Sequence, residues 1–236
     1  MSTGQPDPAA KRPLRGRRIF LSASIPRPDW KGEEFDPLEI TDAVVACAPT
    51  LWLAGGRILC GGHPAITPLL LRVARDFRPV AESDQVPGPE PLVTIYQSEL
   101  YRDKIPEQTL RLQAAGLGRI VFVPAAPGDS PERQHNAASL AVMRGAMLAK
   151  ENDPAFAIFI GGMEGIDAEF DEYRRQYPDR PVYAIGASGG MARRIAARLM
   201  RDEPFRLVRP EDLLNSAQYS TLMDDILADA VDRIGY

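Results

Sequence analysis

Four predicted strands end in glycine or serine, where bulkier side chains would normally fill the space. These ends are Ser22-Ala23-Ser24, Gly61-Gly62, Gly161-Gly162 and Gly186-Ala187-Ser188-Gly189-Gly190. Strand ends of this kind expose backbone N–H groups, and the N-terminus of a following helix favours an anion. A single glycine pair is also compatible with a tight turn and nothing more. Four such ends at one edge of a sheet favour a cradle for a phosphate or a phosphorylated sugar.

Side chains that can bind or act on such a ligand follow the same stretches. His63 and Thr67 come after the first glycine pair, and they serve either a ligand or the turn into the next helix. Glu169 falls in the first turns of the helix after the second pair, where a carboxylate also suits the helix dipole. In a hydrolytic site Glu169 would activate water, with Asp167 as the competing acid.

Further candidate positions have equally simple structural explanations. Arg133 follows the fourth predicted strand and can bind a phosphate through two nitrogens, although a solvated helix face also explains it. Gln97, at the end of the third strand, either faces a base or is an ordinary exit from the strand. Ser188 and Gly189 open a helix, which makes them either an anion site or a helix cap.

Several familiar kinds of site lose support because their motifs are missing. The sequence has neither GxxxxGK[ST] nor a strand-anchored GxGxxG, which argues against a P-loop NTPase and a standard dinucleotide dehydrogenase. It also lacks HExxH and any CxxC pair. Cys47 and Cys60 lie in apolar stretches, as buried reduced thiols do. We therefore expect neither a metal ion nor a resident cofactor.

The composition is that of a folded domain. The 236 residues are 44% hydrophobic and carry a net charge of −4, which allows a sizeable core and argues against a general nucleic-acid binder. No segment is apolar over the length needed to cross a membrane, and no secretory signal stands at the N-terminus. We expect a cytoplasmic protein without a membrane partner, in which residues 1–16 form a disordered basic tail.

Strand and helix patterns alternate along the rest of the chain. Short apolar runs predict strands at 19–24, 57–60, 92–96, 120–123, 155–160 and 182–185. Helical spacing and caps such as Asp36 and Ser130 predict helices at 37–49, 65–76, 106–115, 131–150, 164–176, 189–201 and 217–234. The alternation predicts a single Rossmann-like α/β domain over residues 17–236, with a mainly parallel sheet of six or seven strands flanked by helices. In that fold the glycine-rich strand ends meet at one edge.

Three segments match known proteins in their order and spacing: IFLSASIP at 19–26, GGHPAITP at 61–68 and GGMEGIDAEF at 161–170. Together they resemble the SLOG superfamily, and the resemblance spans residues 17–200. This superfamily includes the LONELY GUY phosphoribohydrolases, the DprA-type proteins, and nucleotide-sensing domains of TRPM channels and bacterial defence proteins. Members often dimerise, so the resemblance implies a homo-oligomer, for which the helix at 217–234 offers either an interface or a cover for the sheet edge.

The enzyme branch of the superfamily carries the motif PGGxGTxxE. Here Ile160 replaces the proline, Ile166 replaces the threonine, and one extra residue separates Gly162 from Gly165. Glu169 keeps the spacing of the glutamate that, in the phosphoribohydrolases, works with an arginine on the N-glycosidic bond of a nucleoside monophosphate. The resemblance therefore makes Glu169 the candidate catalytic residue.

The resemblance leads to three functional hypotheses. The departures from the enzyme motif resemble the sensor branches, so the first hypothesis is a sensor of an ADP-ribose-type or cyclic-nucleotide signal in a bacterial defence or stress system. The second is an N-glycosidase of the LONELY GUY type, with Glu169 and Arg133 as catalytic residues. The third, weaker one is a scaffold for an effector protein. The residues expected to bind the ligand are Ser22, Ser24, Gly61, Gly62, His63, Thr67, Gln97, Gly161, Gly162, Met163, Glu164, Gly165, Gly186, Ser188 and Gly189.

Overall fold

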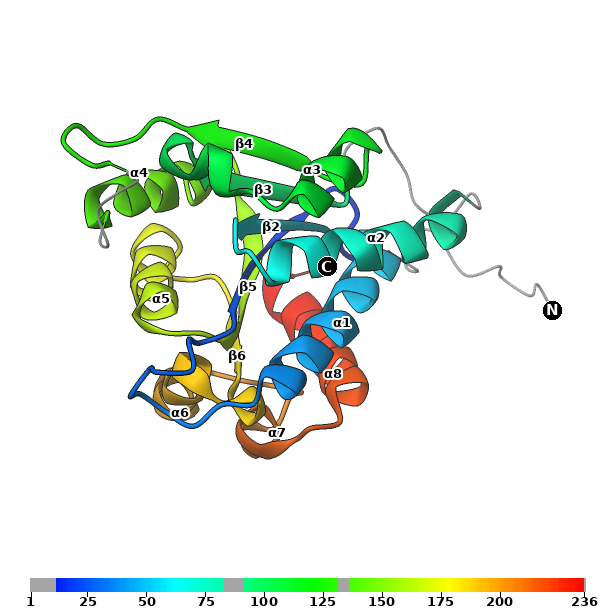
Figure 1. Cartoon of the computed structure of the whole chain (residues 1–236). Coiled ribbons are helices and arrows are strands. Elements are labelled where there is room, and N and C mark those ends of the chain that lie inside the picture. The colour runs from blue at the N-terminus through cyan, green and yellow to red at the C-terminus, as the bar shows by residue number, and fades with distance from the viewer. Residues whose placement is uncertain (1–11, 83–90, 131–135, 236) are drawn as a thin grey trace.

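The centre of the protein is one sheet of six parallel strands (Figure 1). The computed structural model describes residues 12–82, 91–130 and 136–235. The strands are β1 (Arg18–Ser24), β2 (Arg57–Gly61), β3 (Val93–Ser98), β4 (Arg119–Val123), β5 (Pro154–Gly161) and β6 (Val182–Ile185). They lie in the order β4-β3-β2-β1-β5-β6. The predicted Rossmann-like α/β fold with a parallel sheet is confirmed.

The two central strands are buried on both faces. Ile19, Phe20 and Leu21 of β1 have no exposed surface, and all eight residues of β5 are buried. Strands that read as continuous apolar runs are typical of a parallel sheet covered by helices on both sides. This explains why these strands lack the alternation of polar and apolar residues that a half-exposed strand shows.

Helices cover both faces of the sheet, and each layer encloses its own hydrophobic core (Figure 1). One layer consists of α1 (Pro37–Leu53), α2 (Ile66–Glu82), α3 (Glu107–Ala114) and α8 (Tyr219–Ile234). The other consists of α4 (Ala137–Met147), α5 (Glu164–Gln176) and α6 (Gly190–Asp202). Three short helices lie in the connections: η1 (Glu99–Lys104), η2 (Gly186–Ser188) and α7 (Pro210–Asn215). None of the described helices is both long and apolar enough to cross a membrane.

Helix α1 begins at its predicted cap and runs one turn further than predicted. The carboxylate of Asp36 accepts a 2.8 Å hydrogen bond from the N–H of Leu38, as an N-cap side chain does. The helix continues past Pro49 because the residues that follow, Leu51 and Trp52, are fully buried in the core. Tertiary packing therefore decides where α1 ends.

Helix α4 is shorter than the helix predicted at 131–150, and Ser130 is not its cap. The capping contact comes from Asp129, whose carboxylate accepts a 2.8 Å hydrogen bond from the N–H of Ser139 in the first turn. Ser130 lies in the connection that precedes the helix. Arg133, a candidate catalytic residue, falls outside the described residues.

The folded domain begins before residue 17. Leu14 is fully buried, and its N–H donates a 2.8 Å hydrogen bond to the carbonyl of Ala54. Residues 12–16, which the sequence assigns to a disordered tail, therefore belong to the domain because an apolar side chain anchors them. Residues 1–11 lie outside the described part of the chain.

Helix α8 packs against α1 and ends the described chain (Figure 1). Its apolar stripe is turned into the core of the same domain, where Leu222, Ile226 and Ala230 are buried. This helix therefore covers the sheet on the α1 side, beside the edge strand β6.

Candidate functional site

The order of the strands reverses direction beside β1. From β1 the chain builds β2, β3 and β4 on one side, and it then crosses over to form β5 and β6 on the other. In open parallel sheets, ligands bind outside the carboxyl ends of the strands at this kind of switch point. Ser22 and Ser24 of β1 lie opposite Phe159 and Gly161 of β5 at this point.

A carboxylate from α5 lies against the end of β1. The hydroxyl of Ser22 is buried and donates a 2.6 Å hydrogen bond to Oε2 of Glu169. A side-chain carbon built on Gly61, at the end of β2, would lie 3.7 Å from Oε1 of Glu169. Burial raises the pKa of Glu169, while the Ser22 hydrogen bond and the charge of Arg144 act in the opposite direction. Glu169 therefore keeps its proton to a higher pH than an exposed glutamate.

Arg144 on α4 is the cation that acts electrostatically on this carboxylate. Its charge favours the ionised forms of both Glu169 and Glu172. Sequence reasoning missed this residue and considered Arg133 in its place. Arg144 is the one charged side chain in the sequence of α4, AASLAVMRGAM, and this isolated charge is the signal that could have identified it.

The glycine-rich ends of β5 and β6 are closed by backbone packing. A side-chain carbon on Gly190 would lie 2.8 Å from the carbonyl carbon of Gly161, and one on Gly189 would lie 2.2 Å from the carbonyl oxygen of Glu34. Gly189 and Gly190 also have φ values of +77° and +64°, in the region that favours glycine. These close approaches explain why positions 189 and 190 are glycine, without a ligand.

The N-terminus of α6 is likewise not the open anion site that the sequence predicts. The N–H of Gly190 donates to the carbonyl of Glu34 at 2.9 Å, and the N–H of Met191 donates to the carbonyl of Gly162 at 2.8 Å. Donors that already have partners within the protein do not offer a binding site for phosphate. The segment before α1 supplies one of these partners, and local sequence around α6 could not reveal it.

Ser188 and Gly186 have structural roles at the end of β6. The buried hydroxyl of Ser188 donates to the carbonyl of Ile185 at 2.8 Å and accepts from the N–H of Gly161 at 3.3 Å. A side-chain carbon on Gly186 would lie 3.0 Å from the Cβ of Ala196 on α6. These residues tie β5, β6 and α6 together.

The connection from β5 into α5 is more open. A side chain on Gly165 would meet no described atom within 4 Å, and Met163 just before the helix is partly exposed. Glu164 is exposed and accepts a 2.8 Å hydrogen bond from the indole nitrogen of Trp30, which lowers the pKa of Glu164. The first turn of α5 is therefore reachable by a ligand, and Glu164 fixes the segment that follows β1.

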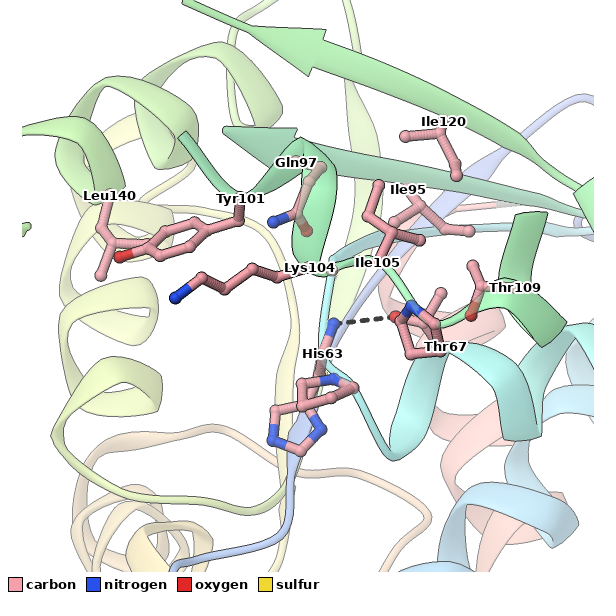
Figure 2. A pocket seen from close by; sticks show the side chains of 13 residues that line it. His63, Thr67, Ile95, Gln97, Tyr101, Lys104, Ile105, Thr109, Ile120 and Leu140 are labelled. Carbon is pink, nitrogen blue, oxygen red and sulfur yellow. Dashed lines mark hydrogen bonds between the residues drawn. The ribbon is translucent and has the colours of Figure 1, made fainter. Parts of the chain in front are cut away.

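A cavity of about 450 Å³ lies beside the carboxyl ends of β2 and β3 and is also lined by Ile120 of β4 (Figure 2). Of the residues expected to bind a ligand, the wall contains Gly62, His63, Thr67 and Gln97. The remaining wall is largely aliphatic and comes from η1, α3, α4 and the neighbouring strands. Its members are Pro64, Ile95, Tyr101, Lys104, Ile105, Pro106, Thr109, Ile120 and Leu140.

His63 lies in the cavity wall as a neutral imidazole. Its Nδ1 accepts hydrogen bonds from the N–H groups of Ala65 at 3.2 Å and Ile66 at 3.3 Å, so the ring proton is assigned to Nε2. Burial lowers the pKa of His63 to about 4. The hydroxyl of Thr67 accepts a 2.8 Å hydrogen bond from the N–H of His63 and fixes the loop.

Helix η1 contributes two polar residues that motif reasoning did not single out. Figure 2 shows Tyr101 and Lys104 extending from η1 toward the open space beside His63. η1 begins directly after β3, and the hydroxyl of Ser98 caps it by accepting from the N–H of Leu100 at 3.3 Å. The position of these two residues just after a strand was the signal that could have identified them. η1 itself is too short to show a helical pattern in the sequence.

The described residues offer no cluster of three or more histidine, cysteine or acidic side chains that could hold a metal ion. Both thiols are buried, and burial raises the pKa of Cys47 and of Cys60 to about 12. They are therefore protonated at neutral pH and lie in the core.

The parallel sheet and its switch point define a Rossmann-like α/β domain. The chain belongs to the SLOG cluster3 family, whose model matches residues 32–227. The resemblance to the SLOG superfamily is thereby confirmed, and it indicates a nucleotide-related function. The crystal structure of the structural-genomics target TM1055 shares the fold with a TM-score of 0.51 at 14% identity, covering 90% of this chain and 98% of that chain. No curated protein gives a significant match to this sequence.

Proposed function

We propose that this protein binds a nucleotide-derived ligand at the switch point between β1, β2 and β5, with a ribose next to Glu169. The observation that carries the proposal is the 2.6 Å hydrogen bond between Ser22 and Glu169 at the switch point. Carboxyl groups with perturbed pKa values in such clefts are typical of binding and catalytic sites. Gly61 has no side chain, so the Glu169 carboxylate lies close to the end of β2, in a space that it shares with Met143 and Met147.

The neighbouring cavity supports a ligand larger than a sugar. Its volume of about 450 Å³ lies within the range of small-molecule sites, roughly 300–1,000 Å³. The ammonium group of Lys104 and the hydroxyl of Tyr101 supply a positive charge and a hydrogen-bonding group for a phosphorylated ligand (Figure 2). His63, being neutral, adds a donor at Nε2 without adding charge.

A sensor role is supported by the substitution at Ile166. This residue stands where the enzyme motif has threonine, and it is buried beside the glycine pair of β5. A side-chain carbon on Gly162 would lie 2.2 Å from Cδ1 of Ile166, so the isoleucine occupies that space with an apolar group. A site altered in this way favours binding over turnover. On this reading the ligand is an ADP-ribose-type or cyclic-nucleotide signal in a bacterial defence or stress system.

Hydrolysis of an N-glycosidic bond is the second candidate, favoured by the raised pKa of Glu169. The bond between ribose C1′ and the base nitrogen would break, the oxygen of water would bond to C1′, and a proton from water would end on the base. Glu169 would take up and pass on that proton, or stabilise the positive charge that develops on the ribose. The charge of Arg144 acts on the same carboxylate and would keep part of it ionised.

The test is calorimetric titration of the full chain with ADP-ribose, AMP and cyclic AMP. We expect wild-type protein to bind at least one of them, and Glu169→Gln to weaken that binding about tenfold or more, because a hydrogen bond to a charged group contributes about 1.5–3 kcal/mol. Asp171→Asn on the same helix is the matched control, since Asp171 is exposed and pairs with Arg198. It should bind as wild type does.

Absence of binding to every nucleotide in the panel, or equal losses in Glu169→Gln and Asp171→Asn, would contradict the proposal. Chromatography of the same mixtures separates its two forms. Release of free base that stops in Glu169→Gln favours the hydrolase, and binding without release favours the sensor.

A further inference from the structure

The cavity contains a buried hydroxyl group without a partner. Thr109 on α3 is 1% exposed and lines the cavity, and among the described residues its Oγ1 has no hydrogen-bond partner. Buried polar side-chain atoms in folded proteins are nearly always paired, either within the protein or with a bound molecule. A lone hydroxyl in a cavity wall therefore offers a hydrogen bond to a ligand atom or a water molecule in the cavity.

A second polar group lies at the end of β3, close to the backbone of β2. The amide of Gln97 lies across this backbone, so close that a side-chain carbon on Gly62 would be 1.7 Å from Oε1 of Gln97. Glycine at position 62 is what allows the amide to lie there. The Gln97 amide offers both an acceptor and a donor to the cavity that it lines.

The wall between these polar groups is apolar. Ile95 and Ile120 are register neighbours on β3 and β4, so their side chains form a continuous surface within the cavity. Ile105 and Leu140 add further aliphatic wall from the end of η1 and from α4 (Figure 2). Apolar walls with a few placed hydrogen-bonding groups are typical of sites for small organic ligands.

We propose that this cavity takes the purine or pyrimidine ring of the ligand, with the Thr109 hydroxyl and the Gln97 amide hydrogen-bonding to its polar edge. The ring face lies on the surface of Ile95 and Ile120, which matches its apolar π-face. Thr109 and Gln97 are then residues that determine which base is bound. Both side chains contact the ring and neither contacts the sugar.

This inference rests on the proposed function, because the two parts of the site meet at the glycine pair of β2. Gly61 lies beside the Glu169 carboxylate, and the next residue, Gly62, forms part of the cavity wall. Consecutive residues of a strand face opposite sides of the sheet, so the cavity and the carboxylate lie on either side of β2 and adjoin at its end. A planar ring joined directly to a sugar is a ligand that spans two such neighbouring parts across the strand end.

The test compares Thr109→Val with Thr109→Ser in calorimetric titrations with AMP, GMP, CMP, UMP and ribose 5-phosphate. Valine keeps the shape of threonine and removes the hydroxyl, whereas serine keeps the hydroxyl. For the nucleotide that wild type binds best, we expect Thr109→Val to weaken binding about fivefold to tenfold, the effect of one hydrogen bond. We expect Thr109→Ser to stay within about twofold of wild type, and ribose 5-phosphate to bind equally to all three proteins.

A second variant, Gln97→Met, tests the other polar group with little change of shape, and we expect it to weaken nucleotide binding while leaving ribose 5-phosphate unaffected. Unchanged nucleotide binding in Thr109→Val would mean that the hydroxyl meets only water, and it would overturn this inference while leaving the proposed function intact. Equal losses for ribose 5-phosphate and nucleotide would also overturn it, since they indicate a general distortion. Wild-type protein that binds none of the five probes, and neither ADP-ribose nor cyclic AMP, would overturn the proposed function itself.

Discussion

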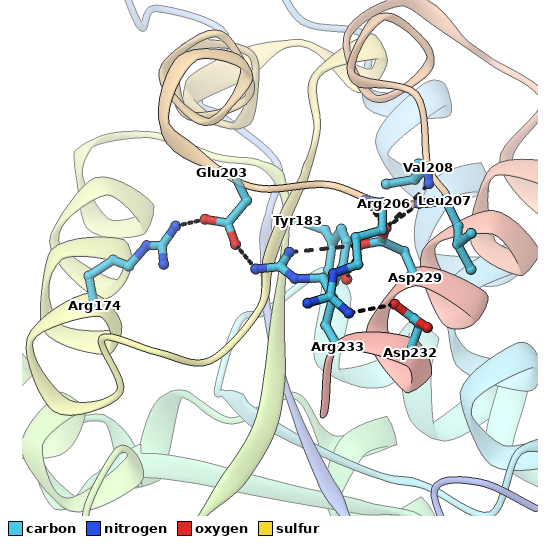
Figure 3. Close-up of polar contacts among 9 residues, drawn as sticks. All are labelled: Arg174, Tyr183, Glu203, Arg206, Leu207, Val208, Asp229, Asp232 and Arg233. Atoms are coloured by element: carbon cyan, nitrogen blue, oxygen red, sulfur yellow. Dashed lines mark hydrogen bonds and ion pairs between the residues drawn. The ribbon is translucent and has the colours of Figure 1, made fainter. Parts of the chain in front are cut away.

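Tyr183 on the edge strand β6 donates a 2.7 Å hydrogen bond to Oδ2 of Asp229 on the C-terminal helix α8, and both residues are fully buried (Figure 3). The other carboxylate oxygen accepts from the N–H groups of Arg206 and Leu207, each at 2.5 Å. Burial disfavours the charge on Asp229, but these hydrogen bonds outweigh it and lower the pKa of the carboxyl. One carboxylate thus joins α8, β6 and the segment between α6 and α7.

Removal of the Tyr183 hydroxyl should destabilise the fold. Tyr183→Phe leaves Asp229 one hydrogen bond short, and we expect a loss of about 1.5–3 kcal/mol in the free energy of unfolding, since the acceptor is charged. Tyr177→Phe is the matched control, because the Tyr177 hydroxyl donates to the neutral carbonyls of Leu148 and Ala149. That change should lose only about 0.5–1.5 kcal/mol in urea unfolding. Equal losses in the two variants would refute a special role for the buried carboxylate.

The same pair predicts a dependence on pH. Because the pKa of Asp229 is lower in the folded than in the unfolded state, its stabilisation is present above the unfolded pKa of about 3.9 and is lost as the pH falls through the folded value. The difference in unfolding free energy between wild type and Tyr183→Phe should therefore shrink in acid. A difference that stayed constant from pH 7 down to the pH at which the wild type unfolds in acid would show that the carboxylate charge is not involved.

Glu169 should affect the pH dependence of stability in the opposite direction to Asp229. Its folded pKa is raised, chiefly by burial, so the folded state holds the proton more tightly than the unfolded state. Stability is then lost as the pH rises above the unfolded pKa of about 4.3 and through the folded value. Glu169→Gln removes the charge and keeps an acceptor for the Ser22 hydroxyl, so we expect a higher melting temperature than wild type at pH 8. The gain should vanish near pH 4, and a lower melting temperature at pH 8 would contradict it.

The sheet was predictable because apolar runs and helical spacing are local properties. The helix predicted at 164–176 and the strand predicted at 182–185 have the bounds that the structure gives to α5 and β6. Short elements escaped prediction for a physical reason. α7, at Pro210–Asn215, is too short to show a helical period, and so is η1.

The sequence predicted several residues of the candidate site, but not which of them contact each other. Ser22 was singled out at the end of a strand, and Glu169 by its place in the helix after another strand and by the spacing of the family motif. Their hydrogen bond nevertheless joins positions 147 residues apart in the chain. Glycines were harder to interpret, because a glycine required by a neighbouring backbone looks the same in sequence as one required by a ligand. The partner of Gly190, the carbonyl of Glu34, lies far away in the chain and is not visible from the α6 sequence.

Two glycine-to-alanine changes test whether a glycine is required by a neighbouring backbone or by a ligand. Gly190→Ala introduces a side-chain carbon 2.8 Å from the backbone of Gly161 at a φ of +64°, so we expect a loss of about 2–4 kcal/mol from strain and overpacking together. Gly145→Ala, inside α4, meets no atom within 4 Å and should gain up to about 1 kcal/mol from helix propensity. Urea unfolding of both variants measures the contrast. If Gly190→Ala unfolded like wild type but lost nucleotide affinity, the glycine would serve a ligand after all, and the packing explanation for the β5 and β6 ends would be wrong.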